Sequence, residues 1–246
     1  MLEQLSAWFD GVKAEFILNF VEKNRWKMLV TGLENTLIIT FFALLIGMAI
    51  GVVIAVVRTT RDQTRQGRRS VGSVLLGVAD TVCRIYTTVI RGTPVVVQLM
   101  IMYFIIFASS DNGVMIAIIA FGLNSGAYVS EIFRGGILAV DKGQMEAGRS
   151  LGLNYLQTML HVIAPQVLKN VLPTLANEFI VLIKETSVAG YVAVMDLTFA
   201  GNRIRGATYS AFMPLIAVAL IYLVLVMFLT WLVGKLERRL RQGDNR

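Results

Sequence analysis

Two acids, a lysine and an amide stand in one apolar stretch of this chain, where they are well suited to bind a polar solute. Glu178 and Glu185 are seven residues apart, which places them on one face of a helix. Lys184 precedes Glu185 and follows Asn177 by seven residues. Carboxylates accept hydrogen bonds from ammonium groups, and cations pair with carboxylates. The set can therefore hold a zwitterion without covalent chemistry.

A second polar stripe lies in a different apolar stretch. Asn124, Tyr128 and Glu131 are spaced by four and three residues, and Ser125 follows Asn124. Ionisable groups at membrane depth are costly and are functional candidates by default. We expect the two stripes to line a solute pathway. The alternatives are internal ion pairs that hold the protein together and, for Glu131, a side chain that reaches the membrane surface.

Metal binding and covalent catalysis find little support in the sequence. His161 is the only histidine and Cys83 the only cysteine, and one of each cannot build a zinc site from protein ligands alone. We expect His161 to pack or hydrogen-bond locally and Cys83 to pack in a helix. There is no His-Glu-x-x-His sequence and no Gly-x-x-x-x-Gly-Lys-Ser/Thr phosphate loop. We therefore predict no catalytic residues and no metal.

The composition indicates a membrane protein with several spans. The mean hydropathy is +0.67, and 56% of the 246 residues are hydrophobic while 16% are charged. The net charge of +7 could suggest nucleic acid, but the basic residues cluster at the ends of apolar runs, as in membrane proteins. We expect no nucleic-acid partner.

Apolar runs predict an all-α protein with about five transmembrane helices. The spans are expected at 36–57, 93–108, 113–133, 171–195 and 211–234. An amphipathic segment, 1–30, precedes a single transmembrane domain, 31–246, and is expected to lie along the outer surface. Residues 71–90 have helical periodicity and are expected to pack on the protein or lie at the interface.

Two finer features belong to these helices. Asp80 and Arg84 are one helical turn apart and can pair. Gly47 and Gly51, four residues apart in the first span, either let another helix approach closely or reflect the general frequency of glycine in such helices.

The basic residues predict the orientation. The segment 58–70 and the last twelve residues carry five basic residues each, and 109–113 carries none. Basic loops stay in the cytoplasm. The N-terminus is then outside, the C-terminus is cytoplasmic, and residues 134–170 form a cytoplasmic connection between the third and fourth spans.

That connection has the pattern of two short helices. Asp141 can begin a helix that continues over 145–151, Gly152 can take the left-handed conformation that ends it, and a second helix can follow over 154–163 before Pro165. The segment is either a compact docking unit for another protein or an ordinary loop.

The same segment resembles the EAA loop of ATP-binding cassette (ABC) importer permeases. Glu146, Ala147, Gly152 and Pro165 stand in that pattern, while Gly148 replaces its second alanine. Val162 and Ala164 stand for its isoleucine and leucine. The resemblance implies that a short coupling helix seats in a groove of an ATP-hydrolysing subunit.

Further blocks are similar to the polar amino acid permeases within that family. They are Arg91-Gly92-Thr93-Pro94 followed by Gln98, the segment 122–128, and the segment 177–187. Glu185 stands where that subfamily usually has aspartate.

The resemblance implies a non-catalytic permease subunit of an ATP-driven importer in the bacterial cytoplasmic membrane. It also implies four partners: an ATPase subunit dimer that carries ATP and Mg, a second permease chain, identical or not, an extracytoplasmic solute-binding protein, and the amino acid itself. No cofactor is expected on this chain. The competing hypotheses are an ion-coupled secondary transporter and an intramembrane enzyme. The first leaves the two-helix segment unexplained, and the second lacks a nucleophile with its base.

Overall fold

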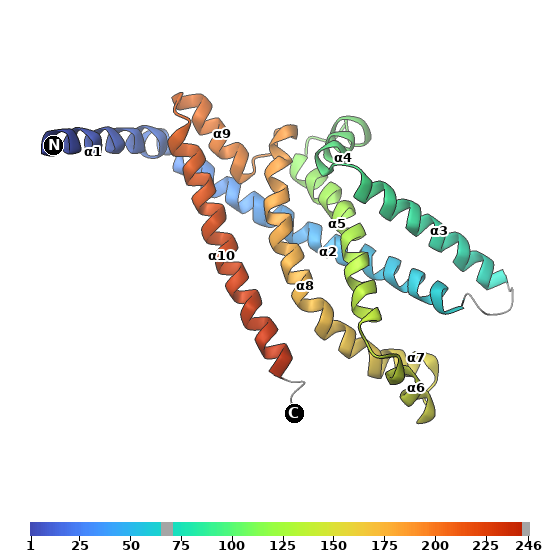
Figure 1. The fold of residues 1–246 in the computed structure, drawn as a ribbon. Coiled ribbons are helices and arrows are strands. Elements are labelled where there is room, and N and C mark those ends of the chain that lie inside the picture. The colour runs from blue at the N-terminus through green and yellow to red at the C-terminus, as the bar shows by residue number, and fades with distance from the viewer. Residues whose placement is uncertain (65–70, 243–246) are drawn as a thin grey trace.

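The computed structural model describes residues 1–64 and 71–242, and all regular elements within those ranges are helical (Figure 1). This confirms the predicted all-α class. The α-helices are α1 (Leu2–Phe16), α2 (Trp26–Thr64), α3 (Val71–Gly92), α4 (Val95–Ile101), α5 (Gly113–Leu138), α6 (Lys142–Ser150), α7 (Tyr155–Thr158), α8 (Ala164–Glu185), α9 (Leu197–Thr208) and α10 (Phe212–Gln242). Residues 65–70 of the predicted cytoplasmic loop and 243–246 of the tail lie outside the described part.

Shorter turns extend or join these helices. Three are π-helical, at Ile17–Val21, Met102–Ile106 and Met159–Ile163, and two are 3₁₀-helical, at Glu22–Asn24 and Thr186–Val192. Lys23 and Asn24 have positive φ, so the chain changes direction between α1 and α2. Helix α1 projects away from the bundle (Figure 1), and α2 already begins at Trp26, inside the predicted 1–30 segment.

Four described helices are long and apolar enough to cross a membrane: Trp26–Asp62, Val71–Gly92, Gly113–Leu138 and Phe212–Leu240. Two of them contain the predicted spans 36–57 and 113–133, and Phe212–Leu240 covers the predicted span 211–234 except for Ala211. The fourth, Val71–Gly92, covers residues 71–90, which were expected to pack on the protein or lie at the interface, and it is long and apolar enough to cross instead. Its 22 residues cover about 33 Å at 1.5 Å per residue, enough for the hydrocarbon core.

The predicted span 93–108 is too short. Pro94 caps a new helix, and the apolar helical segment is Val95–Ile106, about 18 Å long. The predicted span 171–195 does not correspond to one helix, and no described helix in this region is among the four that are long and apolar enough to cross. Helix α8 begins at Ala164, with Pro165 in its first turn, and gives way to a 3₁₀ turn after Glu185.

Helices α2 and α5 pack more closely than any other pair, and small residues make this possible. A Cβ atom at Gly47 would lie 2.8 Å from Ser125 Oγ, and one at Gly51 would lie 2.6 Å from Val129 Cγ1. Gly122 and Gly126 of α5 are equally tight against isoleucines of α2. The predicted close approach of a helix at Gly47 and Gly51 is confirmed, and α5 is the partner.

The two ends of the bundle carry different elements. Helices α6 and α7 extend beyond α5 and α8 at the end where α10 finishes, and α4 and α9 lie at the opposite end (Figure 1). Asp196 caps α9 by accepting hydrogen bonds from the Thr198 and Phe199 amides at 2.8 and 3.2 Å. Its side chain is buried, and burial raises the pKa of this carboxyl to about 6.

Candidate functional site

A chain of hydrogen bonds joins α4 to α5. Gln98 donates from Nε2 to Thr93 Oγ1 at 2.7 Å and to the Ile90 carbonyl at 2.8 Å. Its Oε1 accepts from Asn124 Nδ2 at 3.0 Å. Asn124 is buried, and this hydrogen bond gives its side-chain amide a partner inside the protein. Thr93, Pro94 and Gln98 therefore fix the turn between α3 and α4 onto α5.

The neighbouring residue on α5 reaches a different helix. Ser125 Oγ donates to Glu178 Oε1 of α8 at 3.1 Å, and Ser125 has no exposed surface. Glu178 is half-buried. The structure thus brings together three segments that are far apart in the sequence, since α4, α5 and α8 meet through Gln98, Asn124, Ser125 and Glu178.

The rest of the α5 stripe turns toward α2 and α3. The Arg91 guanidinium lies 5.4 Å from the centroid of the Tyr128 ring. Glu131 bonds to Arg58 of α2 through Oε1 and to Arg134 through Oε2, the latter at 3.0 Å. Glu131 is therefore tied to its neighbours. Asn124, Tyr128 and Glu131 thus contact residues other than Glu178, and among the described hydrogen bonds it is the one from Ser125 to Glu178 that connects the two polar sets.

The α8 residues that follow Glu178 are more open. Asn177 and Lys184 are exposed, and Glu185 is half-buried. No ion pair within 4.0 Å joins Glu178, Lys184 or Glu185 to another described side chain. In the described part of this chain, the ion pairs considered for Glu178, Lys184 and Glu185 are therefore not formed, whereas Glu131 does pair with Arg58 and Arg134.

Helix α3 carries charges that the sequence analysis did not connect to the site. The predicted pair of Asp80 and Arg84 is present at 2.9 Å, and Arg84 also lies 3.6 Å from Asp62 of α2. A hollow of about 290 Å³ is lined by arginines, threonines and one acid: Arg58, Arg84, Thr87, Thr88, Arg91 and Glu131. Arg58 was assigned to a loop, although α2 continues without interruption past Val57.

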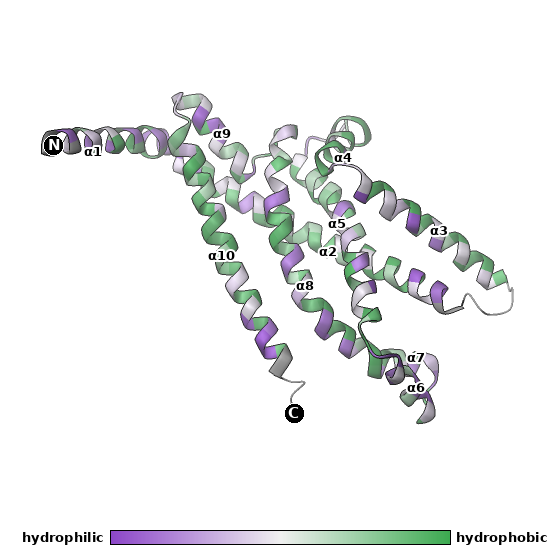
Figure 2. Ribbon diagram, viewed as in Figure 1, coloured by the Kyte–Doolittle hydropathy of each residue, from purple (hydrophilic) through white to green (hydrophobic). Residues whose placement is uncertain are grey.

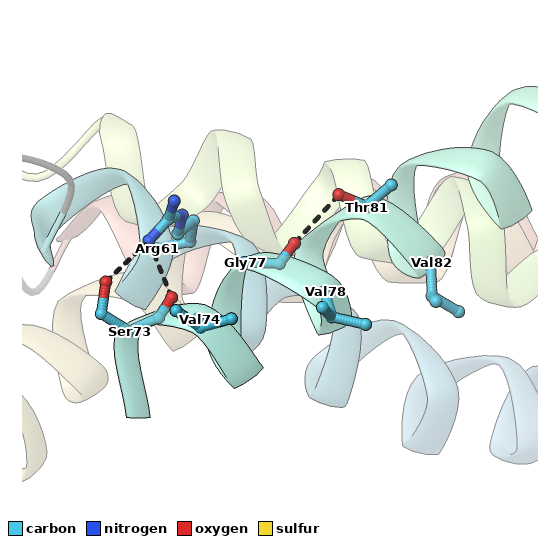
Figure 3. A pocket seen from close by; sticks show the side chains of 7 residues that line it. All are labelled: Arg61, Ser73, Val74, Gly77, Val78, Thr81 and Val82. Atoms are coloured by element: carbon cyan, nitrogen blue, oxygen red, sulfur yellow. Dashed lines mark hydrogen bonds between the residues drawn. The ribbon is translucent and has the colours of Figure 1, made fainter. Parts of the chain in front are cut away.

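A larger hollow lies along α3, beside Arg61 near the C-terminal end of α2 (Figure 3). It measures about 470 Å³. Three of its seven lining residues are valines. Its one charged side chain, Arg61, donates to the Ser73 carbonyl at 3.1 Å and to the Ser73 hydroxyl at 3.4 Å. With one cation and no acid, it is a poorer match for a zwitterion than the Glu178 region.

The two-helix segment between α5 and α8 has the predicted form. Asp141 caps α6 by accepting from the Gly143 amide, and Gly152 has φ of +85°, as the left-handed end of a helix requires. Asn154 and Gln157 form a capping box at the start of α7. Gly148 is buried against Thr158, so α6 and α7 pack as one unit, which we term the coupling unit (residues 141–163).

The surface of the coupling unit combines exposed leucines with charges of both signs. Leu151, Leu156 and Leu160 are 84%, 63% and 57% exposed, and Glu146 and Ala147 are exposed beside them. His161 Nδ1 lies 2.9 Å from the Gln157 carbonyl, the local hydrogen bond expected for it. Isolated exposed leucines are common, but three on one small unit mark a surface for another protein.

Within the described residues, no group of three His, Cys, Asp or Glu side chains is arranged to hold a metal ion. The arrangement can bind and orient a polar solute through Glu178 and its neighbours, and it can receive force through the coupling unit.

Comparison with known proteins places these features in context. Residues 69–242 match the family described as binding-protein-dependent transport system inner membrane components. The chain is 37% identical to the arginine transport system permease protein ArtQ of Bacillus subtilis, over 88% of this chain and 94% of that protein. It is 35% identical to the glutamine transport system permease protein GlnP of Escherichia coli, over 87% and 93%.

Solved structures agree at the level of the fold. One chain of an amino acid ABC transporter crystallised with histidines superposes with a TM-score of 0.77 at 37% identity, covering 89% of this chain and 98% of that one. A chain of the methionine transporter MetNI, in an inward-facing conformation, gives a TM-score of 0.72 at 21% identity over the same shares.

Proposed function

Because this chain belongs to the family of binding-protein-dependent transport system inner membrane components, we propose that it is the permease subunit of an ABC importer for a polar amino acid. The observation that carries the proposal is the coupling unit: a capped pair of short helices, with exposed leucines on its surface, at one end of helices that hold buried polar contacts. It suits an ATPase subunit that pushes on α5 and α8 together.

The proposed topology has five crossings, by α2, α3, α5, α8 and α10. In this topology α3 takes the place of the predicted span 93–108, so the number of crossings stays at five. With an odd number of crossings, the N-terminus remains outside and the C-terminus remains cytoplasmic. Helices α4 and α9 then lie on the outer side, and the coupling unit lies with the basic end of α10 in the cytoplasm, which agrees with the distribution of basic residues.

The amino acid would pass beside α8. Glu178, held by Ser125, offers a carboxylate to the solute ammonium, and Lys184 offers a cation to its carboxylate. Asn177 and Lys184 are exposed on one chain, so a second permease chain would complete the pathway. Glu185 lies seven residues, or about two helical turns, after Glu178 and extends the same face.

The remaining partners follow from the transport mechanism. Glu146, Ala147 and the exposed leucines would seat in a groove of an ATPase subunit dimer, which binds ATP and Mg. A solute-binding protein would deliver the amino acid on the outer side of the bacterial cytoplasmic membrane. This chain would supply the pathway and the mechanical link and perform no catalysis of its own.

The pathway is tested with Glu178→Gln in proteoliposomes that contain the permease, its ATPase subunit and its binding protein. Uptake of a panel of labelled amino acids and ATP hydrolysis are both measured. We expect uptake to fall by about tenfold or to change its preference, a change of roughly 1.4 kcal/mol, while ATP hydrolysis without solute persists.

Glu34→Gln, at an exposed acid on α2, is the matched control and should leave uptake unchanged. Unaltered uptake and preference in Glu178→Gln would contradict the pathway. Uptake that survives loss of the ATPase subunit and is abolished by an uncoupler would instead indicate ion-coupled transport.

A further inference from the structure

The basic end of α10 carries a groove that the transport function does not use. It measures about 460 Å³ and follows one face of the helix over three turns. It is lined in order by Val226, Met227, Thr230, Trp231, Lys235 and Arg238. Much of α10 is exposed, and Met227 and Trp231 are 63% and 55% exposed.

The chemistry changes steadily along this groove. Its first turn is aliphatic, its middle holds a hydroxyl and an indole, and its last turn holds two cations. Figure 2 shows the same change, with hydrophobic residues along most of α10 and hydrophilic residues at its end. This is the order that a phospholipid presents, from acyl chain through glycerol to phosphate.

The cations are positioned over the groove. Lys235 Nζ lies 3.7 Å from the centroid of the Trp231 ring, and Trp231 stacks on Phe228 with centroids 6.2 Å apart. The indole is thus held from both sides, and the ammonium is kept close to the helix. No acid is among the residues that line the groove, although Glu237 precedes Arg238 in the sequence.

A glycine keeps the groove open at the level of the indole. A Cβ atom at Gly234 would have nothing within 4 Å. The space beside Trp231 therefore belongs to the groove, and a side chain at position 234 would enter it without displacing protein.

We propose that this groove is a binding site for one anionic phospholipid. The acyl chain lies along Val226 and Met227, the Thr230 hydroxyl meets the glycerol region, and Lys235 and Arg238 bind the phosphate. A second copy of the chain is a poorer occupant, because a symmetric contact at this end would bring Lys235 and Arg238 against their own copies. The site requires only that this end of α10 reach a bilayer surface, and it stands independently of transport.

The test uses Trp231 as the reporter. Trp8→Phe and Trp26→Phe leave it as the only tryptophan. The protein is placed in nanodiscs with either phosphatidylglycerol or phosphatidylcholine brominated on its acyl chains, each as a minor component of unbrominated phosphatidylcholine. Quenching of Trp231 fluorescence measures how often each lipid lies beside it.

We expect the phosphatidylglycerol to quench at a concentration about fivefold lower than the phosphatidylcholine, and this preference to fall to about twofold in Arg238→Gln, where Lys235 remains. Arg239→Gln removes the same charge from a residue outside the groove and should keep the preference. Gly234→Val changes no charge and should reduce quenching by the brominated phosphatidylglycerol.

Equal quenching by the two lipids would overturn the proposal, as would an equal loss in Arg238→Gln and Arg239→Gln. Absence of quenching by either lipid would also overturn it and would indicate that protein covers this face.

Discussion

At the scale of single residues, Gly148 and Thr158 determine how closely the coupling unit can pack. A Cβ atom at position 148 would lie 2.4 Å from Thr158 Cγ2. Gly148→Ala should therefore destabilise the unit by about 1–3 kcal/mol, as overpacking does, and weaken copurification with the ATPase subunit. Thermal unfolding and copurification measure the two effects.

Thr158→Ser provides the control for this clash. Serine removes the clashing methyl and keeps the hydroxyl that donates to the Asn154 carbonyl at 3.0 Å. Gly148→Ala combined with Thr158→Ser should recover stability, helped by the better helix propensity of alanine. A double variant as impaired as the single one would show that the methyl contact is not the cause.

Asp196 should make stability depend on pH. Its pKa is about 6 when folded, against 3.8 for an unperturbed aspartate, because burial disfavours the carboxylate. The folded state therefore binds the proton more tightly, so stability is highest below about pH 4 and falls as pH rises toward 6. The full difference is about 3 kcal/mol.

Asp196→Asn keeps an acceptor for the Thr198 and Phe199 amides and cannot ionise. Melting temperatures measured from pH 4 to pH 7 should therefore fall more steeply in the parent protein than in this variant. Parallel curves would contradict the assignment of a raised pKa.

Helix caps, the turn glycine and the local ion pair were largely predictable from the sequence. The direction in which a helical side chain points within the bundle was not. The left-handed Gly152, the cap at Asp141 and the pair of Asp80 with Arg84 depend on neighbours within a few positions, which the sequence displays directly. Whether Tyr128 faces α3 or α8 depends on how α5 is rotated in the bundle. That rotation is set by long-range packing, which no spacing encodes.

At the scale of helices, the contact of α2 with α5 depends on glycine. Gly51→Ala would place a methyl group 2.6 Å from Val129 Cγ1 and 2.9 Å from the Ser130 amide nitrogen. It should lower stability by about 1–3 kcal/mol, because neither helix can move without disturbing its other contacts. Thermal unfolding in detergent is the measurement.

Gly135→Ala is the matched control on α5, since a Cβ atom there would have nothing within 4 Å. It should be neutral or stabilising by up to about 1 kcal/mol. If both variants lose the same stability, backbone flexibility rather than close packing explains the glycines.

The contrast between α3 and residues 93–108 shows where hydropathy alone is a poor guide to helix length. Helix α3 contains Asp80, Arg84 and Arg91, which lower its apparent suitability for a membrane, but Asp80 and Arg84 pair with each other and Arg91 lies near Tyr128. Residues 93–108 contain no charge, yet Pro94 starts a new helix that ends after Ile106. The length of an uncharged stretch was therefore a weaker guide to the helix boundaries than the position of Pro94.

At the scale of the whole molecule, ion pairs link the C-terminal part of α2 to α3 and to α5. Arg58 joins α2 to α5 through Glu131, and Arg84 joins α3 to α2 through Asp62. The coupling unit continues from α5 and into α8. Force applied to this unit would therefore move α5 together with α2 and α3, which is how a small cytoplasmic contact could reorient a pathway.

The central claim is that ATP hydrolysis on a partner drives transport through the coupling unit. The most direct measurement is ATP-dependent amino acid uptake in proteoliposomes with Glu146→Arg, alongside Lys142→Gln as a control on the same short helix. We expect Glu146→Arg to lower uptake and ATPase copurification by about tenfold or more, roughly 1.4 kcal/mol of docking free energy, and Lys142→Gln to preserve both. Full ATP-driven uptake and intact assembly in Glu146→Arg would contradict the account.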